Sequence, residues 1–420
     1  MLYYYSALFV PRVAAVAEVK SLGGGYFFAN DFYPVWLTSR ELLRARRDPY
    51  TPEMTREIQL GLYGRPLDPH RQGDPADQRA FVHPAFTDLV FWPAAELSFP
   101  MARIVVVASL GILTIAGIFL WLRALDWNLS WRWIGVSLLL ILSSYPALEA
   151  LFVGQIGLLV IFLLAATVAA LHKERLLLAG ICLALSMMKP QLVALVTLYL
   201  LVWASQHWVR GKRFVYGFFL TLASLVSTSL IVLPHWISSW VHGILVYRDY
   251  TRPPLVSEVI TRPLGPQFCG PATFILTTAS LVIALILIRK NRRAPIQSFE
   301  FWFTFTVLLA LSVITILPGQ AVYDHLVLVP AIFLLIRDRH RFLSSGRVSQ
   351  LLFTIGAAAL FWPWIAALGL TLLSCFAPKI PSSAAVLSLP LRTTASLPFA
   401  VLALLFCAWR VTSQQHSRPA

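Results

Sequence analysis

The sequence predicts an all-α polytopic membrane protein. Apolar residues make up 58% of its 420 residues, whereas charged residues make up only 13%. These values lie outside the range of soluble globular domains. The apolar residues also form runs of about 20, the length that an α-helix needs to cross the hydrocarbon core of a bilayer.

The formal net charge of +15 indicates topology, because the basic residues cluster in short loops between the apolar runs. Such clusters mark the cytoplasmic side of inner-membrane proteins. We therefore expect membrane lipid around the chain and no nucleic acid as a partner. The 4 cysteines are scattered and show neither the spacing of a metal site nor a disulfide framework.

The N-terminal segment, Met1 to Lys20, is apolar but is interrupted by Arg12 and Glu18. It shows no small-residue cleavage site and is not a typical cleavable signal. We expect it to be a shortened first span.

Further spans follow from the rule of about 20 apolar residues at a rise of 1.5 Å each. Runs long enough to be spans are Arg103 to Leu122, Trp131 to Leu148, Gly154 to Leu171, Phe214 to Leu233, Ala272 to Ile288, Phe301 to Leu317 and Leu351 to Leu373. Two shorter runs, Leu326 to Ile336 and Ser396 to Trp409, are marginal. The chain as a whole then holds roughly 10–12 transmembrane helices.

The apolar run from Leu176 to Ala204 is interrupted near its middle by Lys189 and Pro190. Proline removes a backbone donor and breaks or kinks a helix. A lysine at this depth is costly unless it faces a cavity. We interpret the run as two half-spanning helices that meet at Lys189.

Loop charges set the orientation. Basic clusters at Arg289 to Arg293 and at Arg337 to Arg347 are predicted to be cytoplasmic. When the spans are counted back from these clusters, both ends of the Leu176 to Ala204 run fall on the cytoplasmic side. This favours a broken hairpin that enters and leaves the membrane on the same side. Residues 21–100 then form a first extracytoplasmic loop with short amphipathic helices, and residues 234–271 form a second. The chain reads as a single integral membrane domain, 1–410, followed by a cytoplasmic tail, 411–420.

With this topology, the polar side chains gather on the extracytoplasmic side. They are Asp31, His83, Glu149, Gln155, Lys189, Arg248, Asp249, Asp324 and His325. The second outer loop also carries Arg252 and Arg262, against the charge rule. Arginines placed there favour an anionic ligand such as a phosphate, although they could equally snorkel or pair with Asp249 and Glu258.

Asp31 stands where the short apolar N-terminal segment gives way to the first outer loop. An acid at this point could simply cap the helix that follows, because carboxylates accept hydrogen bonds from free amides at a helix start. The sequence around it carries more information than this.

The stretch from Asp31 to Tyr50 reads DFYPVWLTSRELLRARRDPY. It resembles the opening signature of the polyprenol-phosphate-mannose-dependent mannosyltransferases, glycosyltransferase family 87. That pattern runs from an Asp-Phe pair through a leucine-rich amphipathic helix to a Pro-Tyr. The stretch from Phe81 to Ala102, FVHPAFTDLVFWPAAELSFPMA, resembles the aromatic-proline segment of the same family.

Later stretches agree with the family in the same order. They are GQIGLLV from Gly154, AGICLALSMMKPQL from Ala179 and YDHLVLVPAIFLL from Tyr323, which resemble its Gly-Gln, Lys-Pro and Tyr-Asp-His motifs. Beyond about Arg347 the chain shows only generic hydrophobicity. No single motif is specific, and the resemblance depends on their order over roughly 300 residues.

The resemblance implies a GT-C membrane fold, a polyprenyl-phosphate sugar donor and transfer to a glycolipid or glycan acceptor on the outer face of the cytoplasmic membrane. The position of the family's catalytic acid corresponds to Asp31. An inverting displacement needs a base that takes the acceptor hydroxyl proton, and the leaving phosphate needs cations or donors nearby.

The other candidate residues follow from these two needs. Lys189, His325, Arg252 and Arg262 are predicted to bind the donor phosphate, and Asn30, His83, Gln155 and Asp324 to bind sugar or acceptor. Each has an alternative: Lys189 could snorkel, Asp324 and His325 could begin a helix as a cap and its neighbour, and Gln155 could serve helix packing. His83 stands where the family often has an aromatic residue.

The sequence shows no paired carboxylates at metal-ligand spacing and no phosphate-cradling glycine loop. We therefore predict no metal, no cofactor and no nucleotide-sugar donor. Two rival functions stay open. A secondary transporter or lipid flippase also has broken helices with a charge near the midplane, and an O-antigen ligase or polymerase would use a diphosphate-linked donor.

Overall fold

The structure is a computed structural model that describes residues 1–19, 26–68, 70–71, 73–317, 321–344, 346–376 and 384–416. All regular secondary structure in these ranges is helical, which confirms the predicted all-α class. The helices before the first long apolar one are η1 (Tyr4–Phe9), α1 (Val10–Val19), α2 (Phe32–Ala45), α3 (Pro52–Tyr63) and α4 (Phe86–Ala95). Helices α2 to α4 are the short helices expected in the first outer loop.

Five of the described helices are long and apolar enough to cross a membrane. They are α5 (Phe99–Ala124), α11 (Trp208–Val232), α14 (Cys269–Asn291), α18 (Arg347–Phe376), and α20 (Leu389–Thr394) taken together with α21 (Leu397–His416). Shorter apolar helices lie between them: α8 (Gly157–His172), α9 (Leu176–Ser186), α10 (Pro190–Gln206) and α15 (Phe299–Thr315). The long helices are fewer than the roughly 10–12 expected, because several apolar runs are interrupted.

One interruption was not expected. The run from Trp131 to Leu148 divides into α6 (Trp131–Leu142) and α7 (Tyr145–Val153), which are bent by 62°. The side chain of Ser144 caps α7 by accepting a hydrogen bond from the amide of Ala147, and Pro146 lies in its first turn. Serine at the cap and proline in the first turn are ordinary helix-start signals, so the prediction of one continuous span here was wrong.

The break at Lys189 was predicted correctly. Helix α9 ends at Ser186 and α10 begins at Pro190. Near the start of α9, the carbonyl of Leu177 contacts Gly217 of α11, and near the end of α10 the carbonyl of Ala204 contacts Gly211. Both ends of the broken run therefore lie beside the first ten residues of one helix, as a hairpin requires.

The remaining helices complete the second half of the chain. They are α12 (Trp236–Tyr250), α13 (Leu255–Leu264), η2 (Pro266–Phe268), η3 (Val322–Leu328), α16 (Val329–Arg337), α17 (Arg339–Leu343) and α19 (Ala384–Leu387). Helix α15 forms the centre of the core, since every residue from Phe301 to Thr315 is buried. It packs against α10, α14 and α21, while α5, α8, α9 and α11 pack against one another in sequence.

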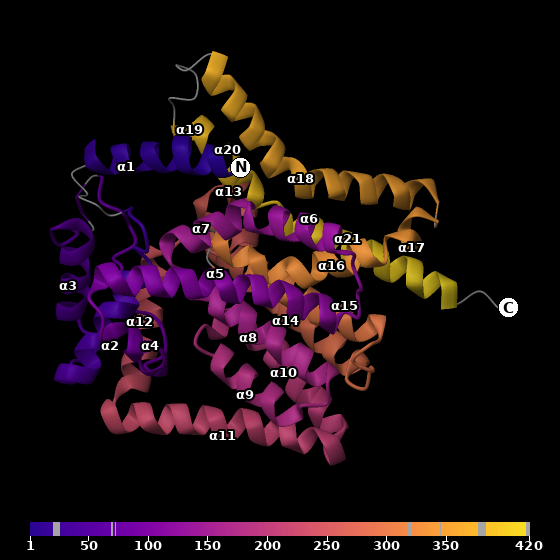
Figure 1. Cartoon of the computed structure of the whole chain (residues 1–420), viewed down its shortest axis with the longest axis horizontal. Coiled ribbons are helices and arrows are strands. Elements are labelled where there is room, and N and C mark those ends of the chain that lie inside the picture. The colour runs from indigo at the N-terminus through magenta and orange to yellow at the C-terminus, as the bar shows by residue number, and fades with distance from the viewer. Residues whose placement is uncertain are drawn as a thin grey trace.

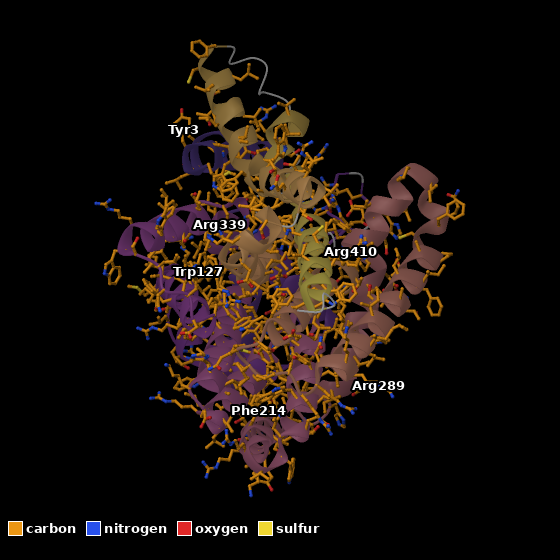
Figure 2. The ribbon with its side chains drawn as sticks, turned by 90° about the vertical axis from the view of Figure 1, so that its right-hand side faces the viewer. Tyr3, Trp127, Phe214, Arg289, Arg339 and Arg410 are labelled. Atoms are coloured by element: carbon orange, nitrogen blue, oxygen red, sulfur yellow. The ribbon has the colours of Figure 1, made fainter. Side chains whose placement is uncertain are left out.

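The two ends of the molecule differ in character (Figure 1). Helices α2 to α4 and α12 gather at the left end, while α17 and the C-terminus lie toward the right, and α5 and α11 run along the long axis between the ends. Figure 2 turns the right-hand end of the molecule toward the viewer and labels Arg289, Arg339 and Arg410 there. Arg289 and Arg339, which belong to the two basic clusters that predicted the cytoplasmic side, thus share one end, opposite the first-loop helices.

Candidate functional site

Asp31 is held in place by the backbone around it. The amides of Ala29 and Asp31 donate hydrogen bonds to the carbonyls of Phe152 and Val153 at the end of α7, at 2.7 and 2.9 Å. This approach depends on Gly154, whose φ of +69° is left-handed and where a Cβ would lie 3.0 Å from Phe32. A side chain at residue 154 would therefore be strained and would push the Asp31 turn away.

The capping interpretation of Asp31 was wrong. Asp31 occupies the residue before α2, but its side chain caps no amide of that helix. Instead, its Oδ1 pairs with Nη1 of Arg79 at 2.9 Å, and its Oδ2 accepts a hydrogen bond from Nε2 of Gln155 at 3.1 Å. The carboxylate is thus aimed away from the helix and toward other polar side chains.

Arg79 reaches Asp31 from the loop between α3 and α4. Its Nε donates to the hydroxyl of Tyr63 at 3.0 Å, and its amide donates to the side chain of Asp77 at 2.9 Å. Its own φ is +60°, which is uncommon for a residue with a side chain. The backbone here is constrained, so the guanidinium is presented in a fixed direction.

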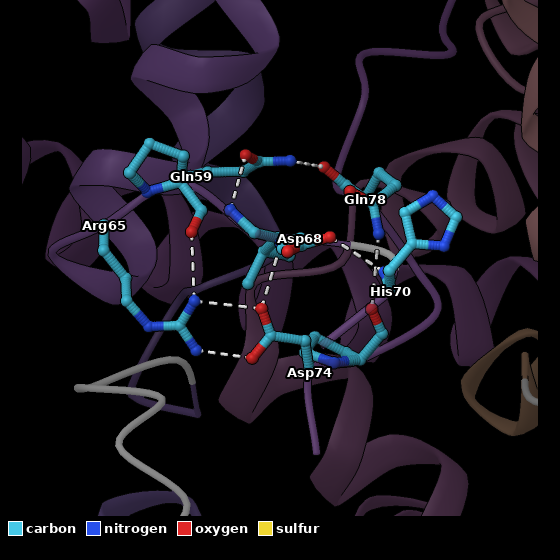
Figure 3. Close-up of polar contacts among 9 residues, drawn as sticks. Gln59, Arg65, Asp68, His70, Asp74 and Gln78 are labelled. Atoms are coloured by element: carbon cyan, nitrogen blue, oxygen red, sulfur yellow. Dashed lines mark hydrogen bonds and ion pairs between the residues drawn. The ribbon is translucent and has the colours of Figure 1, made fainter. Parts of the chain in front are cut away.

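A small network of side chains shapes the loop that carries Arg79 (Figure 3). Gln59 donates to the carbonyl of Gln78 at 2.8 Å and accepts from the amide of Leu67 at 2.9 Å. Both terminal nitrogens of Arg65 donate hydrogen bonds to the carboxylate of Asp74. These contacts tie both ends of the loop to α3, so the loop reaches Asp31 with a defined path.

Lys189 continues the chain of contacts from the other side of Gln155. Its ammonium lies 3.5 Å from Oε1 of Gln155 and 2.7 and 2.8 Å from the two carboxylate oxygens of Asp324. The ammonium also lies 5.1 Å from the centre of the Tyr323 ring. Both predicted alternatives for these residues fail here, because Lys189 is buried instead of snorkelling and Asp324 pairs with it instead of capping a helix.

Gly157 makes room for this pair. A Cβ on Gly157 would lie 2.6 Å from Oδ1 of Asp324 and 3.3 Å from Nζ of Lys189. We name the linked residues Asp31, Arg79, Gln155, Lys189 and Asp324 the polar cluster. It joins residues from the first loop, the α7–α8 turn, the α9–α10 break and η3, and its two acids balance its two cations.

Burial governs how the outer members of the cluster titrate. It raises the pKa of Asp31, and this rise is opposed chiefly by the positive charge of Arg79. His83 lies beside Lys189 and the backbone of Met188, and burial together with the lysine charge lowers its pKa to about 3. His83 is therefore a neutral ring at physiological pH, and Asp31 binds a proton more readily than an exposed aspartate does.

The described residues contain no group of three or more His, Cys, Asp or Glu side chains that could hold a metal ion. The chemistry that this geometry offers is accordingly that of a carboxylate base, two cations and neutral hydrogen-bonding groups. Such a set suits proton removal from a hydroxyl next to an anionic leaving group.

Comparison with protein families decides the class. The model of glycosyltransferase family 87 matches residues 81–318, which is more than half of the chain. The chain belongs to glycosyltransferase family 87. Together with the long apolar helices, this makes it a membrane glycosyltransferase. No curated protein and no solved structure matches it.

The matched region of this family-87 glycosyltransferase includes His83, Gln155 and Lys189. Asp31 and Arg79 precede it, and Asp324 and His325 follow it. The structure joins residues from inside and outside the match in the polar cluster, so the cluster does not depend on the matched region alone.

Other predicted site residues of the enzyme lie elsewhere. His325 follows Asp324 in η3 but lines a separate apolar cavity with residues of α6, α16 and α18. Arg252 is largely exposed and pairs with Glu258 at 3.5 Å, as its alternative interpretation expected. The side chain of Arg262 lies outside the part of the chain that the structure describes. Asn30 is buried directly beside Asp31.

Sequence reasoning missed two features of the enzyme. Nothing marked Arg79 among the charged residues of the first loop, because its partner is 48 residues away along the chain. Glu149 had no assigned role, and its Oε2 accepts hydrogen bonds from Tyr5, Tyr26 and Tyr145 at 2.7, 3.0 and 3.2 Å. This buried group fastens η1 to α7, next to the turn that holds Asp31.

Proposed function

We propose that this membrane glycosyltransferase transfers a hexose, with mannose as the expected sugar, from a polyprenyl phosphate to a glycolipid or glycan acceptor. The observation that carries the proposal is the polar cluster. In this cluster, the partly accessible carboxylate of Asp31 and the buried ammonium of Lys189 both contact the side chain of Gln155. The resemblance of the Asp31, Gly-Gln, Lys-Pro and Tyr-Asp-His stretches to the mannosyltransferases supports this donor.

In the proposed reaction, Asp31 takes the proton of an acceptor hydroxyl as that oxygen attacks the anomeric carbon. The bond between the anomeric carbon and the phosphate oxygen breaks, and polyprenyl phosphate leaves with the electron pair. A single displacement of this kind inverts the anomeric configuration. The raised pKa of Asp31 suits a base that works near neutral pH.

Lys189 is proposed to stabilise the charge of the leaving phosphate. Arg79 is the second cation of the polar cluster. Gln155 lies between the acid and the lysine, so its amide is placed to bind a sugar hydroxyl. Asp324 orients Lys189, and His83 supplies a neutral ring nearby.

Topology supports an outward-facing site in the cytoplasmic membrane. The first-loop helices and the basic loop ends occupy opposite ends of the molecule (Figure 1). Because basic loops usually remain cytoplasmic, we propose that Asp31 and Arg79 lie on the extracytoplasmic side. A GT-C arrangement, and the division into a membrane domain and a short tail, belong to the same proposal.

The experiment that tests this function compares donors. Purified enzyme in lipid nanodiscs receives the same labelled hexose on a polyprenyl monophosphate, on a polyprenyl diphosphate or on a nucleotide, together with a membrane glycolipid extract. Transfer from the monophosphate alone, with inverted configuration in the product, is expected. Preference for the diphosphate would instead support the ligase reading, and retention of configuration would exclude the single displacement.

A further inference from the structure

A cluster of tyrosines lies beside the turn that carries Asp31. One carboxylate oxygen, Oε2 of Glu149 in α7, accepts three phenolic hydrogen bonds. The donors are Tyr5, Tyr26 and Tyr145, at 2.7, 3.0 and 3.2 Å. Hydrogen bonds to a carboxylate are stronger than those between neutral groups. Glu149 is therefore a firm point of attachment for each segment that brings a tyrosine to it.

Tyr26 is the member of this cluster that belongs to the chain leading into Asp31. Its hydroxyl reaches Glu149, and its ring centre lies 5.3 Å from that of Phe152. Further along, the amides of Ala29 and Asp31 donate hydrogen bonds to the carbonyls of the last two residues of α7. This segment is thus fixed to α7 at two points, by a side chain at Tyr26 and by the backbone at the turn.

The other two tyrosines hold different parts of the fold. Tyr145 belongs to α7 itself, so its hydrogen bond to Glu149 ties the helix to itself. Tyr5 comes from η1, and its hydroxyl lies 3.1 Å from that of Tyr26. All three tyrosines share one acceptor oxygen, but only Tyr26 connects that oxygen to the segment of Asp31.

We propose that Tyr26 and Glu149 are positioning residues for Asp31, because together they hold the turn that directs its carboxylate. This inference rests on the proposed function, in which Asp31 is the base. The carboxylate itself contacts Arg79 and Gln155. Tyr26 and Glu149 therefore act through the backbone, where a displacement of about 1 Å is enough to cost about 100-fold in rate.

Paired variants separate this role from a purely structural one. Tyr26→Phe and Tyr145→Phe each remove one hydroxyl from the same carboxylate oxygen. If the cluster only fastens η1 to α7, both should lower the melting temperature without a specific effect on transfer. With the positioning role, Tyr26→Phe should lower kcat about tenfold at an unchanged KM for the donor, and Tyr145→Phe should leave both constants unchanged. Equal kcat values for the two variants would overturn the proposal.

A second background separates positioning from damage to the fold. A positioning residue loses its effect once the group that it positions is replaced. In the Asp31→Asn enzyme, adding Tyr26→Phe should therefore leave the residual single-turnover rate unchanged. A further fall of about tenfold would overturn the proposal, because that effect would not pass through Asp31. If Tyr26→Phe does not fold, Glu149→Gln takes its place in both comparisons, because it keeps the side-chain shape and weakens the same hydrogen bonds.

Hydrogen exchange follows the turn without requiring turnover. In the full chain in nanodiscs, the amides of residues 27–32 should exchange about tenfold faster in Tyr26→Phe than in the parent, and no faster in Tyr145→Phe. Unchanged exchange in Tyr26→Phe would overturn the proposed hold on the turn.

The two proposals fail separately. If the turn loosens in Tyr26→Phe but the parent does not transfer from the monophosphate donor, the hold on the turn stands and the proposed function falls. If the parent transfers and the turn loosens while kcat stays unchanged, only the positioning role falls.

Discussion

Two ion pairs lie on either side of Gln155, and they differ in their access to water. The side chains of Asp31 and Arg79 are 17% and 23% exposed, whereas those of Asp324 and Lys189 are 1% and 6% exposed. The first pair joins the outer loop to the cluster, and the second closes the break between α9 and α10 against η3. The two pairs are therefore suited to different tasks.

Accessibility explains the division of labour. A carboxylate that meets water can exchange its proton with an entering hydroxyl, and an arginine beside it can keep it ionised. A pair without water is held by its own attraction, and removing one partner leaves an uncompensated charge. We therefore propose Asp31 as the reactive acid of the cluster and Asp324 as the acid that orients Lys189.

The largest predicted effect comes from breaking the buried pair. Lys189→Ala or Asp324→Ala alone should lower the free energy of unfolding by about 3–5 kcal/mol, because each leaves one buried charge unpaired. The double change Lys189→Met with Asp324→Leu should cost much less than the sum. Tryptophan fluorescence during denaturant unfolding in detergent measures all of them.

An exposed pair supplies the control for that series. Arg210 and Glu174 lie 3.4 Å apart with side chains 78% and 77% exposed. Glu174→Gln should cost less than about 1 kcal/mol. If Glu174→Gln and Asp324→Ala lowered the free energy of unfolding equally, the proposed difference between the exposed and the buried ion pair would be contradicted.

A smaller effect is expected at the accessible pair. Arg79 opposes the rise in the pKa of Asp31 that burial causes, so Arg79→Gln should raise that pKa further. A base must be ionised to act, so the acid limb of the profile of kcat/KM against pH should move to higher pH by about one unit. At a pH below this limb, kcat/KM should then be about tenfold lower than in the parent. Arg56→Gln, at an exposed position of α3, is the matched control. If the acid limb did not move in Arg79→Gln, the proposed effect of Arg79 on the pKa of Asp31 would be contradicted.

A pH-dependent effect sharpens the comparison with Asp88, an acid that has no cationic partner among the described residues. Oδ1 of Asp88 accepts hydrogen bonds from Thr38 and Ser39, and burial raises its pKa to about 8. The folded state then binds a proton that the unfolded state releases above about pH 4. Stability should fall as pH rises from about 4 to 8, by up to about 1.4 kcal/mol per pH unit.

Asp88→Asn should flatten that dependence and leave the protein folded at pH 8. Melting temperatures in detergent from pH 5 to pH 8 measure it, with Asp126→Asn in the turn after α5 as the control. The same slope in Asp88→Asn as in the parent would show that Asp88 is ionised in the fold.

Local signals explain which elements could be predicted from the sequence. Pro190 cannot continue a helix, so the break beside Lys189 was visible. Ser144 and Pro146 give an equally local signal, but the apolar residues on both sides of them hid it. The short apolar helices α8 and α15 were also identifiable, although their lengths fall below a full span.

The site was only partly predictable for a physical reason. Four members of the polar cluster could be recognised in the sequence, because each is a polar residue within an apolar run or a family motif. They are Asp31, Gln155, Lys189 and Asp324, and the structure brings them together. Arg79 was not, because the path of its loop depends on Gln59, Arg65 and Asp74, which show no periodicity. His325 was predicted to bind the donor phosphate as part of the Tyr-Asp-His motif, but a one-residue step in η3 turns it toward the apolar cavity.

The central claim is that Asp31 is the base, and one measurement addresses it directly. Asp31→Asn keeps the shape of the side chain and one acceptor oxygen, so it can accept from Gln155 or from Arg79 but not from both, and it cannot take a proton at neutral pH. In single-turnover assays with saturating polyprenyl-phosphate hexose, its transfer rate should fall by about 10²–10⁴-fold, with unchanged melting temperature and donor binding. A folded Asp31→Asn enzyme that transfers sugar within tenfold of the parent rate would contradict the account.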